Sequence, residues 1–351
     1  MPSPMTVAAT KDLATGIFRR PSISCSWKVC DAHRTDGAIS CVGDLKFKRM
    51  VGYIVDVWYD RNRNAHFSDC GARHSINTGL LRAMSEQADV PQGIALADML
   101  DDCLTIFPKP HSAILPPLFD LFTSRHPEVS LPRRSFSIYH ILQQVFLKYD
   151  GLFIALKGGS NHEAHNHNDV GQFVIARDGR FDALDLGSAT YDQSTFSEQR
   201  YNHYPQSGLS HNPLVFNGIS QEAGIGRATQ FEASGDEKAF TCKMEISSCY
   251  PASLRLQSYH RTFSYDGRSF IVRDTWKAAL PVKPTMTLLH ERPETPVQCD
   301  LPKATEPYPI SDAWLSNSWG DMLYRTIFTA PEATEGTITL LFPCNSLAEE
   351  T

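Results

Sequence analysis

The chain has 351 residues, of which 42% are hydrophobic and 21% charged, and its formal net charge is -6. This balance is that of a globular protein long enough for two domains, and it argues against disorder and against wholesale nucleic-acid binding. No apolar run approaches membrane-spanning length, and residues 1–20 lack the pattern of a signal peptide. The nine cysteines include no Cys-x-x-Cys pair, which excludes a disulfide framework and a zinc ribbon.

The first third of the chain carries apolar residues at helical spacing. The spacing predicts helices around residues 45–58, 80–84 and 94–104, and a fourth over 114–122. Residues 126–132 have the composition of a linker. Residues 1–44 show no clean helical or strand period, so we expect the chain to begin inside a domain.

From about residue 135 the pattern changes to that of β-strands. Asp-Gly pairs at 150–151, 178–179 and 266–267 each separate two apolar runs, which is a strong hairpin signal. Three such hairpins favour antiparallel sheets over a parallel α/β sheet. The sequence therefore predicts an α+β protein with a helical domain over 1–134 and an antiparallel β domain over 135–351.

The stretch from His165 to Asp169 (HNHND) is the most informative motif. On an extended segment, His165 and His167 would point the same way, because side chains alternate with a period of two. Two such imidazoles can share a metal, or one can hold a metal while the other moves a proton. The alternative is a polar surface loop that happens to be rich in His and Asn.

Two further residues downstream can complete a metal site with His167. Zinc favours three protein ligands drawn from His and carboxylate, and Asp185 and His211 supply the other two from separate β segments. Taken singly, Asp185 could be a turn residue and His211 a loop histidine, but the group as a whole favours a site. Three neighbours are candidates to fix the imidazole tautomers: Asn166, Asn168 and Asp169.

A cupin metal motif is a rival interpretation, because Gly159 precedes the two histidines at a similar distance. A cupin needs a Glu separated from the second His by three or four residues, where this chain has Gly171 and Gln172. A cupin-like metal oxygenase therefore stays a minor alternative.

Several ordered motifs resemble the heparinase II/III-like polysaccharide lyases. They are residues 158–173 (GGSNHEAHNHNDVGQF), 184–188 (LDLGS), 200–202 (RYN), 210–218 (SHNPLVFNG) with Gln221, and 65–69 (AHFSD), the last resembling a segment of the family's helical domain. The resemblance implies a partial (α/α) toroid followed by a multi-sheet antiparallel β domain. It also implies a substrate cleft between the two domains and a periplasmic or secreted protein.

The resemblance further implies that His167, Asp185 and His211 hold a zinc ion and that His165 lines the catalytic centre. Such lyases cleave uronate-containing acidic polysaccharides, such as heparin and heparan sulfate, by β-elimination. The reaction needs a base, a general acid and neutralisation of the uronate carboxylate.

On the β side, His165 and Tyr201 are the catalytic candidates, and Tyr191 and Tyr204 lie close enough in sequence to replace Tyr201. A half-buried aromatic that packs under a loop is an alternative for Tyr201. The substrate-binding candidates are Asn166 and Arg200.

The chain departs from the family on the helical side. Relatives contribute a Tyr with Asn or His from earlier helices, but residues 1–44 contain no Tyr. We therefore expect a lyase with an intact metal site and weakened activity. A non-catalytic, zinc-containing glycan-binding protein is the alternative, and the oligomeric state stays open.

Overall fold

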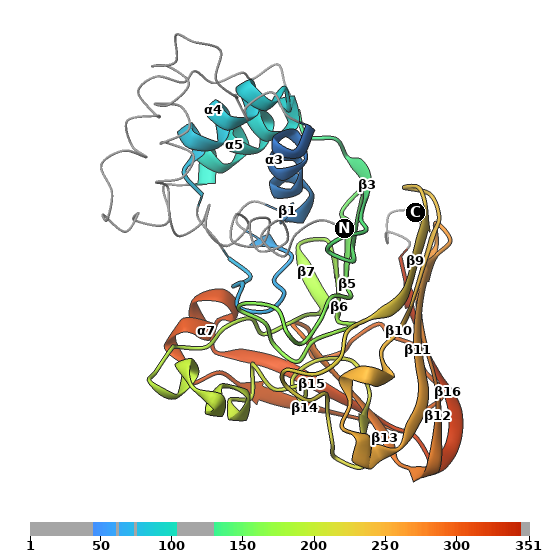
Figure 1. Cartoon of the computed structure of the whole chain (residues 1–351). Helices are drawn as coiled ribbons and strands as arrows, with labels where there is room; N and C mark the ends of the chain where they lie inside the picture. The colour runs from blue at the N-terminus through green and yellow to red at the C-terminus, as the bar shows by residue number, and fades with distance from the viewer. Residues whose placement is uncertain (1–44, 61–62, 74–75, 104–129, 345–351) are drawn as a thin grey trace, which may run out of the picture. The chain divides into compact units, whose positions relative to one another are not determined.

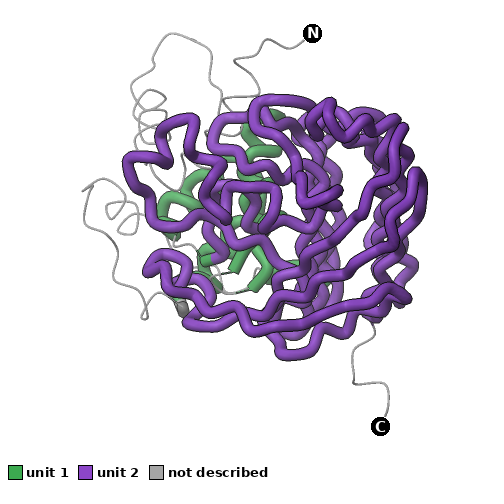
Figure 2. The backbone as a smooth tube through the Cα atoms, turned by 90° about the horizontal axis from the view of Figure 1, so that it is seen from below, with its two compact units in different colours: residues 1–64, 73–133 green, residues 65–72, 134–351 purple. Residues whose placement is uncertain are grey.

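A computed structural model describes residues 45–60, 63–73, 76–103 and 130–344. The chain divides into two compact units: Met1–Asn64 with Arg73–Arg133, and Ala65–Ala72 with Arg134–Thr351 (Figure 2). The helix predicted over 114–122, part of the predicted linker and residues 1–44 lie outside the described residues.

The first unit contains three described helices, which confirm three of the predicted ones. They are α3 (Leu45–Val57), α4 (Thr78–Ala88) and α5 (Pro91–Cys103), with a short hairpin of β1 (Trp58–Asp60) and β2 (Arg63–Asn64). Trp58, expected at the end of a helix, instead opens β1. The buried apolar faces of the helices form one core, whose members include Val51, Ile54, Leu80, Leu81, Met84, Leu96 and Leu100.

The described part of the second unit contains three antiparallel sheets (Figure 1). The first has the order β3-β4-β5-β6-β7, with β3 (Arg134–Tyr139), β4 (Gln144–Tyr149), β5 (Leu152–Lys157), β6 (Phe173–Arg177) and β7 (Arg180–Ala183). The second has the order β16-β12-β11-β10-β9, with β9 (Thr229–Gly235), β10 (Phe240–Glu245), β11 (Leu256–Tyr265), β12 (Ser269–Val282) and β16 (Ala333–Pro343). The third has the order β14-β15-β13-β8, with β8 (Val215–Phe216), β13 (Pro284–His290), β14 (Lys303–Pro309) and β15 (Met322–Thr329).

Short helices complete this unit. Helix α7 spans Ala313–Trp319, and 3-10 turns occupy η2 (Ser194–Phe196), η3 (Glu198–Asn202), η4 (Ser247–Cys249) and η5 (Ala252–Leu254). No helix in the described ranges is long and apolar enough to cross a membrane.

The three Asp-Gly pairs form the hairpins that the sequence predicts. Asp150 and Gly151 have φ angles of 41° and 89°, and Asp178 and Gly179 have 50° and 76°. Positive φ at both central residues matches the right-handed twist of the flanking strands, and Asp and Gly tolerate it. The strands on either side of each pair are antiparallel, which confirms the predicted α+β class.

Aromatic side chains join the first sheet to the second in one apolar core. The Phe173 ring on β6 contacts the rings of Phe263, Phe270 and Phe342 at centroid distances of 6.0, 5.7 and 5.8 Å. All four side chains are fully buried, and each such burial contributes about 1.5–3 kcal/mol. This core fixes the strand ends from which the loops of the candidate site emerge.

Candidate metal and proton-transfer site

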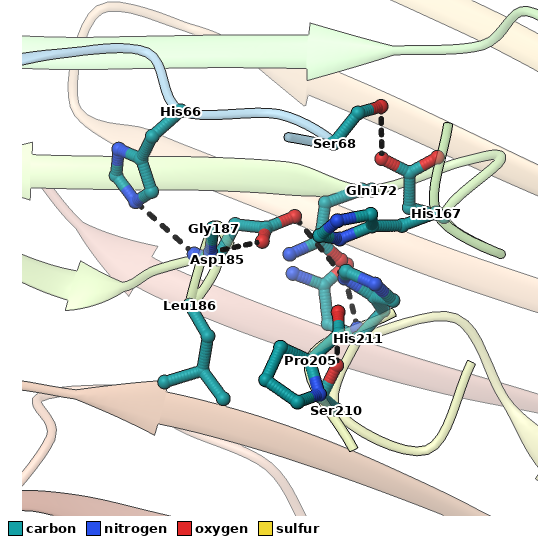
Figure 3. A network of polar contacts seen from close by, with 12 residues as sticks. His66, Ser68, His167, Gln172, Asp185, Leu186, Gly187, Pro205, Ser210 and His211 are labelled. Carbon is teal, nitrogen blue, oxygen red and sulfur yellow. Dashed lines mark hydrogen bonds and ion pairs between the residues drawn. The ribbon is translucent and has the colours of Figure 1, made fainter. Parts of the chain in front are cut away.

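His167, Asp185 and His211 come together in the second unit (Figure 3). His167 lies in the loop between β5 and β6, Asp185 follows the end of β7, and His211 precedes β8. One ligand atom from each residue lies within 4.8 Å of the others, and all three side chains are fully buried. The structure thus places the three sequence-predicted metal ligands in one cluster.

The donor atoms of this cluster suit a metal ion. Among the described residues, the buried atoms without a hydrogen-bond partner include Nδ1 of His167 and Nε2 of His211. Leaving a buried polar atom unsatisfied costs about 1–3 kcal/mol, and a coordinated cation would remove that cost. Two imidazoles and one carboxylate form a donor set typical of zinc.

Asp185 and His211 also influence each other directly, since Asp185 Oδ2 lies 3.1 Å from His211 Nδ1. Burial alone would raise the pKa of Asp185, but the neighbouring His211 lowers it below its ordinary value. Conversely, burial opposes the charged form of His211, while the Asp185 carboxylate raises the pKa of the imidazole. The other Asp185 oxygen accepts a hydrogen bond of 2.9 Å from the Gly187 amide, which fixes the carboxylate in place.

The loop that carries His165 and His167 is not the extended segment that the sequence predicts. His165 has φ of 58°, in the left-handed region that non-glycine residues rarely adopt. As a result the two imidazoles do not share a face: the His165 side chain is 50% exposed, whereas that of His167 is 0% exposed. The strand-alternation argument was therefore wrong for this loop, although both rings contact the same carboxylate, that of Asp69.

Asp69 is a site residue that the sequence argument missed. Its Oδ2 lies 3.0 Å from His165 Nδ1, and its Oδ1 lies 3.2 Å from His167 Nε2. The Asp69 amide also donates to the carbonyl of His165 at 3.2 Å, which supports the unusual backbone there. A carboxylate on one nitrogen of each ring places the proton there and leaves the other nitrogen with its lone pair. The nitrogens left with a lone pair are then Nε2 of His165 and Nδ1 of His167.

Two further contacts hold Asp69 in its charged form. The Arg200 guanidinium pairs with Oδ1, and the Ser188 hydroxyl donates to the same oxygen at 3.2 Å. Burial raises the pKa of Asp69, but the hydrogen bond from His167 and the charge of Arg200 more than offset this and bring it well below the ordinary value.

The segment that carries Asp69 belongs to the second unit, not to the helical domain suggested by the resemblance. Gly187 shows how closely it packs there: its φ is 71°, and an added Cβ would lie 2.5 Å from the Cys70 carbonyl oxygen. On the same segment, His66 Nε2 accepts a 3.2 Å hydrogen bond from the Asp185 amide (Figure 3). The segment therefore supports the cluster of His167, Asp185 and His211 as well as His165.

The other predicted residues also lie in this site. The Tyr201 hydroxyl donates to Asn166 Oδ1 at 2.7 Å, and Arg200 donates to the Asn166 carbonyl at 3.3 Å. Burial raises the pKa of Tyr201, so its hydroxyl keeps its proton at neutral pH. Of the two alternative tyrosines, Tyr191 lies 3.3 Å from the Ser188 hydroxyl, and Tyr204 packs its ring on Tyr308.

Asn168 and Asp169 have a different role from the one predicted. Asn168 donates to the Gln221 carbonyl at 3.2 Å, and the buried Asp169 pairs with Lys157 and accepts from Ser68 at 3.0 Å. These contacts tie the loop to its neighbours, whereas Asp69 is the residue that orients the imidazoles. The resemblance included residues 65–69 but gave Asp69 no role, and this pairing was not predictable because Asp69 lies 96 residues before His165 in the chain.

No family profile matches the sequence. No curated protein matches it either. Solved structures do resemble the fold: a heparinase III, the BT4657 gene product, has a TM-score of 0.59 at 16% identity and covers 86% of this chain and 47% of its own. The heparan sulfate lyase HepC of Pedobacter heparinus has a TM-score of 0.58 at 13% identity, covering 85% of this chain and 46% of its own.

A more distant relative in structure is the chondroitin AC lyase of Streptomyces coelicolor A3. Its TM-score is 0.50 at 9% identity, with 87% of this chain and 50% of its own covered. The chain thus spans about half the length of each of these lyases. At these identities the likeness concerns the fold, and the predicted resemblance to heparinase-type polysaccharide lyases is confirmed at that level.

Proposed function

We propose that the protein is a polysaccharide lyase that cleaves uronate-containing acidic polysaccharides, of the heparan sulfate class, by β-elimination. The observation that carries the proposal is the pairing of Asp69 with His165, which leaves Nε2 of a half-exposed imidazole as the basic atom beside a buried three-ligand cluster. The similarity in fold to a heparan sulfate lyase and a chondroitin AC lyase supports the same class of reaction.

In this proposal His165 removes the proton from C5 of the uronate, whose adjacent carboxylate must be neutralised for the carbanion to form. Arg200, which donates to the Asn166 carbonyl, and Asn166 are the groups that would interact with that carboxylate. Tyr201 keeps its proton and would donate it to the departing glycosidic oxygen. The C4–O bond then breaks while a double bond forms between C4 and C5.

We further propose that His167, Asp185 and His211 hold a zinc ion. The ion would join three loops and hold the segment 165–167 in the shape that presents His165. Its binding free energy would add to the stability of the folded state, because the three ligands converge only there. The elimination steps themselves are assigned to the side chains of the chain.

The test is an ultraviolet assay for the unsaturated uronate with heparan sulfate, heparin, alginate and hyaluronan as separate substrates. We expect elimination with at least one of them, lost in His165→Ala and reduced in Tyr201→Phe. His162→Ala, which alters an exposed histidine of the same loop, is the matched control and should retain the rate. Binding of a glycan without any elimination would contradict the proposal and favour a non-catalytic glycan-binding protein.

A further inference from the structure

Two aromatic side chains are unusually exposed on the second unit. Phe196 is 78% exposed and Trp314 is 53% exposed. Large apolar rings at the surface often mark a binding site, since their burial against a ligand is favourable. The elimination chemistry proposed above uses neither ring.

The Phe196 ring is held in place by a well-defined turn. Oδ1 of Asp192 accepts hydrogen bonds from the Ser194 amide and hydroxyl at 2.8 and 2.7 Å and from the Thr195 amide at 3.1 Å. The Tyr191 ring meets Phe196 edge to face at a centroid distance of 5.6 Å. Because its backbone is fixed, Phe196 can offer a ring face at a small cost in conformational entropy.

Asp312 joins the segment that carries Tyr191 and Phe196 to helix α7, and so to Trp314. Its carboxylate caps the helix by accepting from the Trp314 amide at 2.9 Å, and it also accepts from the Thr190 amide at 3.2 and 3.1 Å. Thr190, next to Tyr191 in the chain, therefore lies beside the first turn of α7, the helix labelled in Figure 1. We call Tyr191, Phe196 and Trp314 the aromatic rim.

The aromatic rim is continuous with the proton-transfer site. The Tyr191 hydroxyl lies 3.3 Å from the Ser188 hydroxyl, which in turn donates to Asp69 at 3.2 Å. The same Asp69 carboxylate holds His165. Phe196 is thus linked to His165 through one ring contact, with Tyr191, and a chain of hydrogen bonds through Ser188 and Asp69.

We propose that the aromatic rim is a sugar-stacking subsite for a pyranose ring next to the one that reacts. A pyranose has an apolar face of C–H groups that packs on an aromatic ring, while its charged substituents stay in water at the edge. Three side chains are far too small a surface for a stable protein partner, which favours one sugar ring as the occupant. This inference rests on the proposed function, because it takes the substrate to be a polysaccharide.

Such a subsite would contribute to affinity for long chains and not to the chemistry itself. An interaction made equally in the ground and transition states changes KM and leaves kcat unchanged. The aromatic rim would bind the apolar face of a sugar ring but would not recognise sulfate groups, since none of its three side chains is cationic. Discrimination among acidic glycans would then fall to Arg200 and its neighbours.

The test measures binding of length-fractionated heparan sulfate by isothermal titration, with Phe196→Ala, Trp314→Ala and Ile141→Ala compared with the unchanged chain. Ile141 is 71% exposed in the β3–β4 turn and serves as the matched control for loss of an exposed apolar side chain. We expect each aromatic variant to weaken binding of long fragments about 2- to 10-fold, the usual range for an aromatic contact. We expect Ile141→Ala to bind long fragments with the affinity of the unchanged chain, and all variants to bind disaccharides with unchanged affinity.

Equal affinities for long fragments in all variants would overturn the subsite, and so would a failure of the unchanged chain to bind any length. The ultraviolet assay separates the two proposals. Loss of affinity in Phe196→Ala without any elimination by the unchanged chain would leave the subsite standing and reject the lyase. Robust elimination with an unchanged KM for polymer in Phe196→Ala and Trp314→Ala would support the lyase and reject the subsite.

Discussion

The two histidines of the central loop occupy opposite environments although only one residue separates them. His167 is fully buried among Asp185 and His211, while half of the His165 side chain is open to solvent. Both rings contact the same carboxylate of Asp69. One carboxylate thus contacts the buried cluster through His167 and the accessible imidazole of His165, to which we assign the proton transfer.

This difference separates stability from chemistry. A buried cluster of ionisable groups must be fully compensated, so any change there should act on folding. Truncating the half-exposed His165 imidazole should change the free energy of unfolding little, so a change there should act on turnover alone. The following substitutions test that separation.

The largest effect is expected for His211→Ala, which removes a proposed zinc ligand and leaves the buried Asp185 carboxylate without its partner. Breaking a buried pair in this way costs about 3–5 kcal/mol of the free energy of unfolding. Denaturant unfolding with and without a chelator measures the loss, and the chelator should have no further effect on the variant. An unfolding midpoint equal to that of the unchanged chain would show that His211 does not bind a stabilising metal.

His165→Ala should leave the free energy of unfolding within about 0.5 kcal/mol of the unchanged value, because the side chain is half exposed. Turnover should fall about 10²- to 10⁴-fold, the usual contribution of a general base. A steady-state ultraviolet assay beside a denaturant titration measures both. A large loss of stability without a change in rate would reverse the roles assigned to the two histidines.

Asp69→Asn should affect His165 and His167 together. Each oxygen of the Asp69 carboxylate can accept a hydrogen bond from one of the two rings, whereas an Asn amide has only one accepting oxygen. We expect metal affinity to fall about 10- to 100-fold and turnover to fall with it. Nitrogen NMR of histidine-labelled protein should show His165 protonated at Nδ1 in the unchanged chain and a mixture of tautomers in the variant.

The control for this variant is Asp182→Asn, which removes another buried, arginine-paired carboxylate of the same unit. It should lower stability without changing the histidine tautomers. Identical NMR spectra for Asp69→Asn and the unchanged chain would show that Asp69 does not orient His165.

The smallest effect concerns the turn that presents Phe196. Hydrogen bonds, the largest from Ser194, lower the pKa of Asp192 from 3.8 to about 2. Because the folded pKa is depressed, this contribution to stability is complete above the ordinary pKa and is lost as the pH falls through about 2. The carboxyl carbon shift of Asp192 should still report the ionised form at about pH 3, where an ordinary Asp is mostly protonated. Titration near 3.8 would mean that the turn is not formed in solution.

Local chemistry explains which parts of the fold the sequence could predict. Asp-Gly pairs specify their hairpins through positive φ at two adjacent residues, so 150–151 and 178–179 were predictable without tertiary information. The change from helical to alternating periodicity likewise separated the helical and β regions. Trp58 was misassigned because a strand that begins directly at a helix end leaves no break in the apolar pattern.

The candidate site was predictable only in part. Ligand chemistry and the resemblance to lyases brought His167, Asp185 and His211 together, and the structure places them in one cluster. The left-handed backbone of His165 could not be read from the sequence, because tertiary contacts with Asp69 support it. The role of Asp69 was hidden for the same reason: its contacts arise only when a segment near residue 70 packs on the β unit.

Metal content, measured by elemental analysis of protein purified without chelator, tests the central claim most directly. The account predicts one zinc ion per chain in the unchanged protein and in His165→Ala, and none in His167→Ala. It would be contradicted by an unchanged protein that carries no metal, or by a His167→Ala variant that keeps its full complement.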